Sequence, residues 1–240
     1  MNKDVEVMQL GAICAIVGGI AFVAPMVFIF ILMPAAGLNW GSMPAEQFLP
    51  QMAQHGGLRS LFWWTVALPF FIVFLSVPGI LKKTLEIHAP GVALLAERLG
   101  AAGLFLCAFS SAVLASGEMP LAQAYVASLR ESQIAIAAVY DWQTKVTALL
   151  FDVCGFLMIG LWILLNSAIG LKKKGSLPAG FGAMGMLAAL LCFCFAIGYL
   201  AQLRWLGEFG IGGLAYFVVP AWVVWLGIFL WRKYKPVRSG

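Results

Sequence analysis

Charged residues are scarce in this chain. Only 10% of its 240 residues are Asp, Glu, Lys or Arg, whereas soluble domains carry roughly 25%. Hydrophobic residues make up 62% of the chain, and the mean hydropathy is +0.96. This composition excludes an ordinary soluble domain and predicts the lipid bilayer as the main partner. The net charge of +5 is typical of membrane orientation signals, so we expect no nucleic-acid partner.

Cysteine and histidine are also few, and their positions do not favour cofactor chemistry. All five cysteines fall within apolar runs, which argues against a disulfide framework. The two histidines, His55 and His88, are expected on opposite sides of a membrane, which excludes a bis-histidine haem site. His55 alone is retained as a candidate ligand for a pigment or metal at the outer surface. Because no metal-ligand spacing or nucleotide-binding loop is present, we expect no catalytic residues, no metal and no cofactor.

Six long apolar runs dominate what is present. About 20 apolar residues are needed to cross a hydrocarbon layer of about 30 Å. In lipid each backbone polar group must be satisfied within its own segment, so these runs are predicted to be helices. The predicted spans are residues 7–33, 61–81, 98–117, 143–166, 180–203 and 212–231. The expected fold is an all-α polytopic membrane helix bundle, with residues 1–240 forming a single integral membrane domain.

Lys and Arg are distributed unequally between the two sides of this arrangement. Eleven of the fifteen lie on the side of the termini, and the other four are Arg59, Arg130, Lys145 and Arg204. The side richer in Lys and Arg is normally cytoplasmic. We therefore expect both termini in the cytoplasm and the protein in the cell inner (cytoplasmic) membrane.

Two long connections are then expected on the outer side. They cover residues 34–60 and 117–142, and the second contains a predicted amphipathic helix over residues 121–138. Connections of this length are often functional, so the outer face is the first place to look for a site.

Asp152 lies deep within an apolar run. A charge at the bilayer centre costs about 2.5–3.5 kcal/mol on insertion scales, so such a residue normally faces the bundle interior or a cavity. Asp141 and Lys145 fall on a similar helix face and are expected to form a polar stripe with it. One interpretation is a proton, cation or substrate site. The other is a hydrogen-bonded carboxyl group that holds helices together, with Ser110 or Ser111 as its partner.

Arg204 and Glu208 are a second candidate pair. They are four residues apart at the outer end of the fifth predicted span, a spacing that permits an ion pair. Arg204 is also a candidate partner of Asp152 if the fourth and fifth spans are neighbours. The alternative is that Arg204 anchors the helix at the interface, and Arg59, beside two tryptophans, is interpreted in the same way.

The stretch from Gly155 to Leu200 carries several packing signals. A helix ending in the segment 160–167 is followed by a basic turn, by Leu177-Pro178 and by the glycine-rich segment 180–185. With Val219-Pro220 and the segment 225–227 in the last span, the chain resembles a bacterial family of six-helix integral membrane proteins of unknown function. The resemblance implies a six-helix fold and brings no catalytic residues with it.

Three functions are compatible with these observations. The first is a non-catalytic accessory or structural subunit of a larger membrane complex. It is favoured by the small residues at four-residue spacing and by the lack of cofactor motifs. We expect such a subunit to have membrane-protein partners or to form a homo-oligomer. The alternative is a small transporter or ligand-binding membrane protein with an outward-facing polar cavity around Asp152. A membrane enzyme acting on a lipid or quinone is the third, and it lacks an identifiable acid, base or nucleophile.

Overall fold

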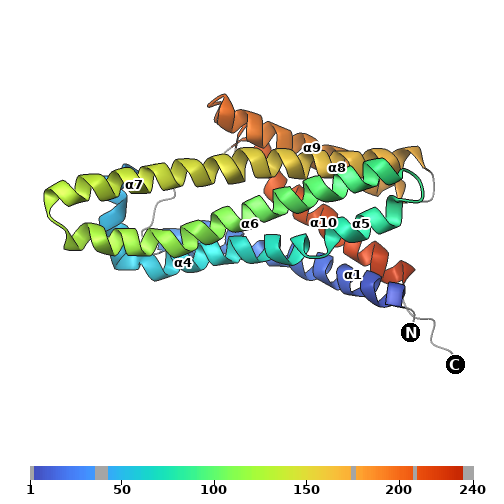
Figure 1. Ribbon diagram of the computed structural model, residues 1–240, viewed down its shortest axis with the longest axis horizontal. Helices are drawn as coiled ribbons and strands as arrows, with labels where there is room; N and C mark the ends of the chain where they lie inside the picture. The colour runs from blue at the N-terminus through green and yellow to red at the C-terminus, as the bar shows by residue number, and fades with distance from the viewer. Residues whose placement is uncertain (1–2, 36–42, 174–176, 208–209, 235–240) are drawn as a thin grey trace.

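The computed structural model describes residues 3–35, 43–173, 177–207 and 210–234. Every element within these ranges is a helix, and six helical spans are long and apolar enough to cross a membrane. The predicted all-α, multi-pass helix bundle is therefore confirmed. The start of α1 and the end of α10 lie at the same end of the molecule (Figure 1).

Four of the six spans are built from more than one helical segment. The first contains α1 (Lys3–Ala21), α2 (Val23–Val27), the π-helical η1 (Phe28–Leu32) and α3 (Met33–Ala35). The second contains α4 (Ala45–Phe74) and α5 (Val77–Leu85), and the third is α6 (Pro90–Ala127). The fourth contains α7 (Arg130–Ala148), the π-helical η2 (Leu149–Gly155) and α8 (Phe156–Lys172). The fifth is α9 (Ala179–Leu200), and the sixth contains the short 3-10 helix η3 (Ile211–Leu214) and α10 (Ala215–Lys233).

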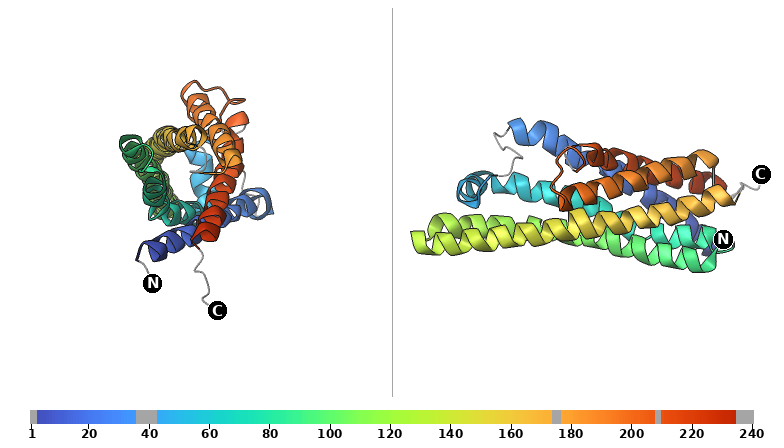
Figure 2. Two further views of the ribbon diagram at one scale, coloured as in Figure 1. Left: turned by 90° about the vertical axis from the view of Figure 1, so that its right-hand side faces the viewer. Right: turned by 90° about the horizontal axis from the view of Figure 1, so that it is seen from above.

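The spans form a closed ring in which each packs on the next. In order around the ring, α4 contacts α6, α6 contacts α8, α8 contacts α9, α9 contacts α10, and α10 returns to α1 beside α4 (Figure 2, left). Small residues permit the close approaches. A Cβ atom added at Gly103 would lie 2.9 Å from the carbonyl oxygen of Gly155, which places α6 directly against η2.

The half of the ring nearest the termini is filled by aromatic side chains. The ring planes of Trp162 and Trp222 are perpendicular with centroids 5.5 Å apart, and Phe181 stacks on Trp222 at 4.7 Å. Phe156 and Phe195 stack at 4.3 Å nearer the middle of the bundle. Offset and edge-to-face ring pairs add to the dispersion contacts that hold helices together where no hydrophobic effect acts between them.

The connections predicted as long loops over residues 34–60 and 117–142 are instead largely helical in their described parts. α4 already begins at Ala45, α6 continues to Ala127, and α7 begins at Arg130. The amphipathic helix predicted over residues 121–138 is also wrong, because the chain turns at Ser128 and Leu129 in its middle. Hydropathy did not extend the predicted spans into these segments, because they are too polar to be recognised as lipid-spanning.

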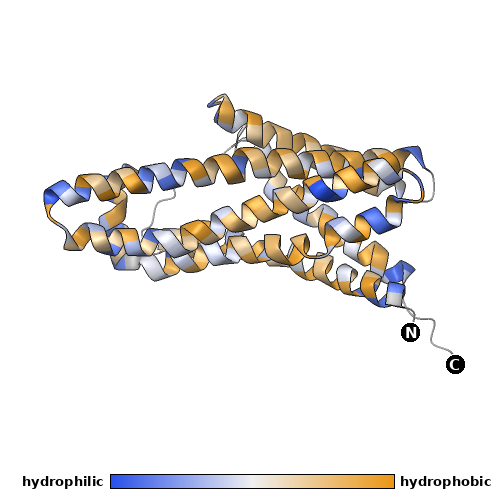
Figure 3. Ribbon diagram, in the orientation of Figure 1, coloured by the Kyte–Doolittle hydropathy of each residue, from blue (hydrophilic) through white to orange (hydrophobic). Residues whose placement is uncertain are grey.

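These extensions form a small helical head, defined here as residues 45–58 and 117–142. Its apolar faces are buried against one another in a separate cluster made of Ala45, Leu49, Met52, Ala122, Tyr125, Ala137 and Tyr140. At 1.5 Å per residue, the 43 residues from Arg130 to Lys172 are about 65 Å long, roughly twice the hydrocarbon thickness. Such a helix is long enough for the head to project beyond an apolar layer of that thickness. Hydrophilic side chains mark the opposite end, called here the basic end, where Lys82, Lys83 and Lys172 lie (Figure 3).

Candidate functional site

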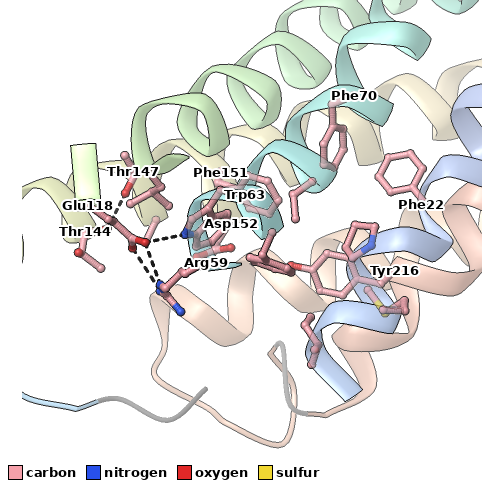
Figure 4. A pocket seen from close by; sticks show the side chains of 17 residues that line it. Phe22, Arg59, Trp63, Phe70, Glu118, Thr144, Thr147, Phe151, Asp152 and Tyr216 are labelled. Carbon is pink, nitrogen blue, oxygen red and sulfur yellow. Dashed lines mark hydrogen bonds and ion pairs between the residues drawn. The ribbon is translucent and has the colours of Figure 1, made fainter. Parts of the chain in front are cut away.

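A cavity of about 180 Å³ lies where the head joins the membrane bundle. Its wall is contributed by α2, η1, α4, α6, α7, η2 and α10, together with Phe22 between α1 and α2, so five of the six spans line it. Six of its 17 lining residues are aromatic. The ring of Phe70 makes edge contacts with Phe22 at 4.8 Å and with Phe151 at 5.6 Å, and Trp63 and Tyr216 complete the wall (Figure 4).

The polar side of the cavity is organised around Glu118. Its side chain is 1% exposed, and its carboxylate accepts two hydrogen bonds from Arg59: Nε to Oε2 at 2.8 Å and Nη2 to Oε1 at 3.2 Å. Trp63 Nε1 donates a third hydrogen bond to Oε2 at 3.0 Å. A buried carboxylate is tolerated only when it is paired and hydrogen-bonded, and Glu118 meets both conditions.

Local helix geometry explains why these donors meet. Arg59 and Trp63 are four residues apart on α4, so they share one face of that helix. Ser60 Oγ donates a hydrogen bond of 2.7 Å to the carbonyl oxygen of Ala115, which fixes α4 against α6 one turn before Glu118. A Cβ atom at Gly56 would overlap the sulfur of Met119, so the two helices are also in close contact at the head.

Arg59 connects the cavity to the head. Its guanidinium carbon lies 4.6 Å from the centre of the Phe48 ring and 5.6 Å from that of the Trp63 ring. Phe48 in turn stacks on Tyr140 of the head at 5.1 Å. Cation–π contacts of this kind are stronger when desolvated. The position of the guanidinium therefore depends on the packing of the head.

Asp152 reaches the cavity from the π-helical segment η2. In Figure 4 its side chain lies on the same side of the cavity as Arg59. π-Helical turns are rare and frequently occur at functional sites. Here the turn places Phe151 and Asp152 on the wall, while Gly155 packs near the sulfur of Cys107 on α6.

The two serines predicted as partners of Asp152 differ in their hydrogen bonding. Ser111 Oγ donates to the carbonyl oxygen of Cys107 in its own helix at 2.9 Å. Ser110 Oγ is buried with no hydrogen-bond partner among the described residues. The charged residues that share the cavity with Asp152 are Arg59 and Glu118.

The structure separates the other predicted site residues from Asp152. Asp141 and Lys145 are exposed on α7 and do not line the cavity, because the π-helical turns between them and Asp152 take more residues per turn than the regular helix assumed from sequence. Arg204 is exposed in the turn after α9, away from the cavity wall. Glu208 lies outside the described residues. His55 belongs to α4, and its side chain lies outside what the structure describes.

The sequence had one signal for the Arg59–Glu118 pair. Arg59 lies just before the start of the second predicted span and Glu118 just after the end of the third, so both belong to the same level of the bundle. Sequence interpretation gave Arg59 only an anchoring role, whereas the structure gives it a buried carboxylate and two ring contacts.

The site combines the Arg59–Glu118 ion pair with aromatic side chains that line the cavity. Within the described part of the chain, no group of three or more His, Cys, Asp or Glu side chains is placed to hold a metal ion. Comparison with protein-family models, with curated proteins and with solved structures finds no match to this chain. The resemblance to bacterial six-helix membrane proteins therefore stays a prediction, and the functional argument depends on the geometry of the cavity.

Proposed function

We propose that this protein binds a small organic cation in the cavity below its head. The observation that supports the proposal most is the charge of the cavity wall, where the carboxyl groups of Glu118 and Asp152 accompany a single guanidinium, that of Arg59. With all three groups ionised the wall has one net negative charge, which a monovalent cation balances. The faces of Trp63 and Tyr216 add the ring quadrupoles that attract organic cations.

The depth of the cavity is consistent with a ligand that arrives from the outer side. Asp152 precedes Lys172 by twenty residues, which is about 30 Å of helix and close to the thickness of the hydrocarbon layer. If the basic end is cytoplasmic, as the Lys and Arg distribution predicts, the cavity lies at the outer border of the layer. The head then projects from the outer face of the cell inner membrane.

The aromatic packing below the cavity favours a binding site over an open channel. Phe156 and Phe195 stack at 4.3 Å between the cavity and the basic end, and Trp162 and Trp222 fill the bundle beyond them. This conformation holds a ligand at one level of the membrane. Transport through the bundle requires a second conformation in which these rings separate.

Binding of a matched pair of ligands to protein in lipid nanodiscs tests the proposal. Phenyltrimethylammonium and its neutral isostere tert-butylbenzene have the same shape and differ in charge. We expect the cation to bind at least about tenfold more tightly to wild type, and Asp152→Asn to remove most of that preference. Asp141→Asn is the matched control, because it removes an exposed carboxylate from the same span. Equal binding of both ligands, or an unchanged preference in Asp152→Asn, contradicts the proposal.

An accessory subunit is the second candidate function, and one observation favours it. The projecting head exposes large apolar side chains, with Leu129 85%, Ile134 69% and Trp142 67% exposed. Apolar surface of this kind on a part outside the lipid suits a protein partner. Gentle detergent extraction, native gel separation and mass spectrometry distinguish the two functions. Migration in a complex of fixed composition, lost in Ile134→Ser with Trp142→Ser, supports the subunit.

A further inference from the structure

A second hollow lies directly beside the cavity. It has a volume of about 500 Å³ and is formed between α1 with α2 on one side and α10 on the other. Its wall is apolar apart from the Tyr216 hydroxyl and the Trp225 indole N–H. It shares Phe22, Met26 and Tyr216 with the cavity. The cavity and the apolar groove therefore adjoin at these three side chains.

The groove extends from the cavity toward the basic end. On α10 its wall runs from Tyr216 to Ile228, twelve residues or about 18 Å of helix. On the first span it runs from Met26 to Gly19, about 10 Å in the same direction. Ala221, Phe217 and Ile228 on its wall are exposed at the surface of the bundle. The groove thus lies parallel to lipid chains and opens on the surface that lipid covers.

The two hollows match the two parts of an amphiphile. The cavity suits a polar head group, and the groove suits an apolar chain. The cavity of about 180 Å³ has room for a head group but not for a long alkyl chain as well. The groove offers length and no charged group. Since the cavity lies near one border of the hydrocarbon layer, a head group bound there leaves its chain at the depth of the groove.

We infer that the ligand is a single-chain amphiphile with a cationic head, such as a long-chain alkylammonium, whose chain occupies the groove between α1, α2 and α10. The inference rests on the proposed cation site and adds the chain to it. The ligand reaches the cavity sideways from the membrane, with its head passing Tyr216 and Met26. With Arg59, Glu118 and Asp152 ionised, the net negative charge of the cavity wall favours this amphiphile over zwitterionic and anionic lipids.

The test compares ethyltrimethylammonium with dodecyltrimethylammonium in equilibrium dialysis against nanodiscs, with empty discs as the blank. Ala221→Phe fills the groove from an exposed position without adding bulk to the buried core. Ala183→Phe is the matched control, because Ala183 is exposed on α9 and lines neither hollow. We expect Ala221→Phe to weaken dodecyltrimethylammonium binding about tenfold or more through overpacking of the groove. Binding of the ethyl compound should change by less than about twofold, as it does not reach the groove.

The outcomes separate the chain from the head. If the ethyl compound binds but the dodecyl compound binds no better than the blank, or is equally tight in Ala221→Phe and wild type, the chain does not use the groove and the cation site stands. If dodecyl sulfate binds as tightly as dodecyltrimethylammonium and only Ala221→Phe weakens both, the groove holds chains and the cation site is overturned. If neither ammonium compound binds, both proposals are overturned.

Discussion

Glu118 and Arg59 lie 59 residues apart in the sequence and form a two-point ion pair at the level where the head joins the membrane bundle. The pair connects α6 to α4, and through the rings of Phe48 and Trp63 it also touches the head and the cavity. A buried ion pair is not in itself a strong source of stability, since desolvation offsets most of the attraction. Its importance here lies in what happens when one partner is removed.

Glu118→Ala should destabilise the protein strongly. The change leaves the Arg59 guanidinium and the Trp63 indole N–H without their buried acceptor, a loss expected to cost about 3–5 kcal/mol. Unfolding in detergent mixtures, followed by circular dichroism, measures it. The control is Lys83→Met, which breaks the exposed contact with Asp4 and should cost less than about 1 kcal/mol. If the double variant Arg59→Met with Glu118→Leu is no more stable than Glu118→Ala, the loss did not come from the unpaired charge.

Gly103→Ala should also destabilise the protein, for a steric reason. The new Cβ atom would lie 2.9 Å from the carbonyl oxygen of Gly155, a backbone atom that cannot move without shifting η2. Overpacking of this kind costs about 1–3 kcal/mol. Gly91→Ala, on the same helix with open space around its Cβ, should be neutral or stabilising by up to about 1 kcal/mol. Equal thermal midpoints for the two variants would show that α6 and η2 are not in close contact.

Leu49→Ala should loosen the head and leave the membrane bundle intact. Leu49 is fully buried in the cluster of the head, and its truncation is expected to cost about 2–5 kcal/mol of local stability. Hydrogen exchange should therefore speed up in residues 45–58 and 120–140, with little change in residues 156–200. Ile134→Ala, at an exposed position of the same head, is the control. Uniform acceleration along the chain would mean that the head and the bundle unfold as one unit.

Hydropathy was enough to predict the six membrane-spanning helices from the sequence. Lipid imposes helices on long apolar runs, so the six spans follow directly from composition. The helical head did not follow, because Leu49, Tyr125 and Tyr140 are spaced among polar residues and are buried only once three helices come together.

Only one residue of the candidate site, Asp152, was predicted from the sequence. A carboxyl group inside an apolar run must face a polar partner or a cavity, and Asp152 does line a cavity. Its neighbours were not predictable, because a π-helical turn has no clear sequence signature and shifts the face on which each side chain lies. Arg59 and Glu118 are far apart in the sequence, and only the contact between α4 and α6 brings them together.

Single-cysteine labelling tests the side on which the head lies. Glu131 lies in the first turn of α7 at the tip of the head, and Lys172 ends α8 at the basic end. If the basic end is cytoplasmic, a membrane-impermeant maleimide added to intact cells should label Glu131→Cys and spare Lys172→Cys. Permeabilised cells should label both. Wild type is the blank, because its cysteines lie within the spans, buried or partly buried. The reverse pattern in intact cells would place the cavity at the cytoplasmic border of the membrane, and the ligand would then come from inside the cell.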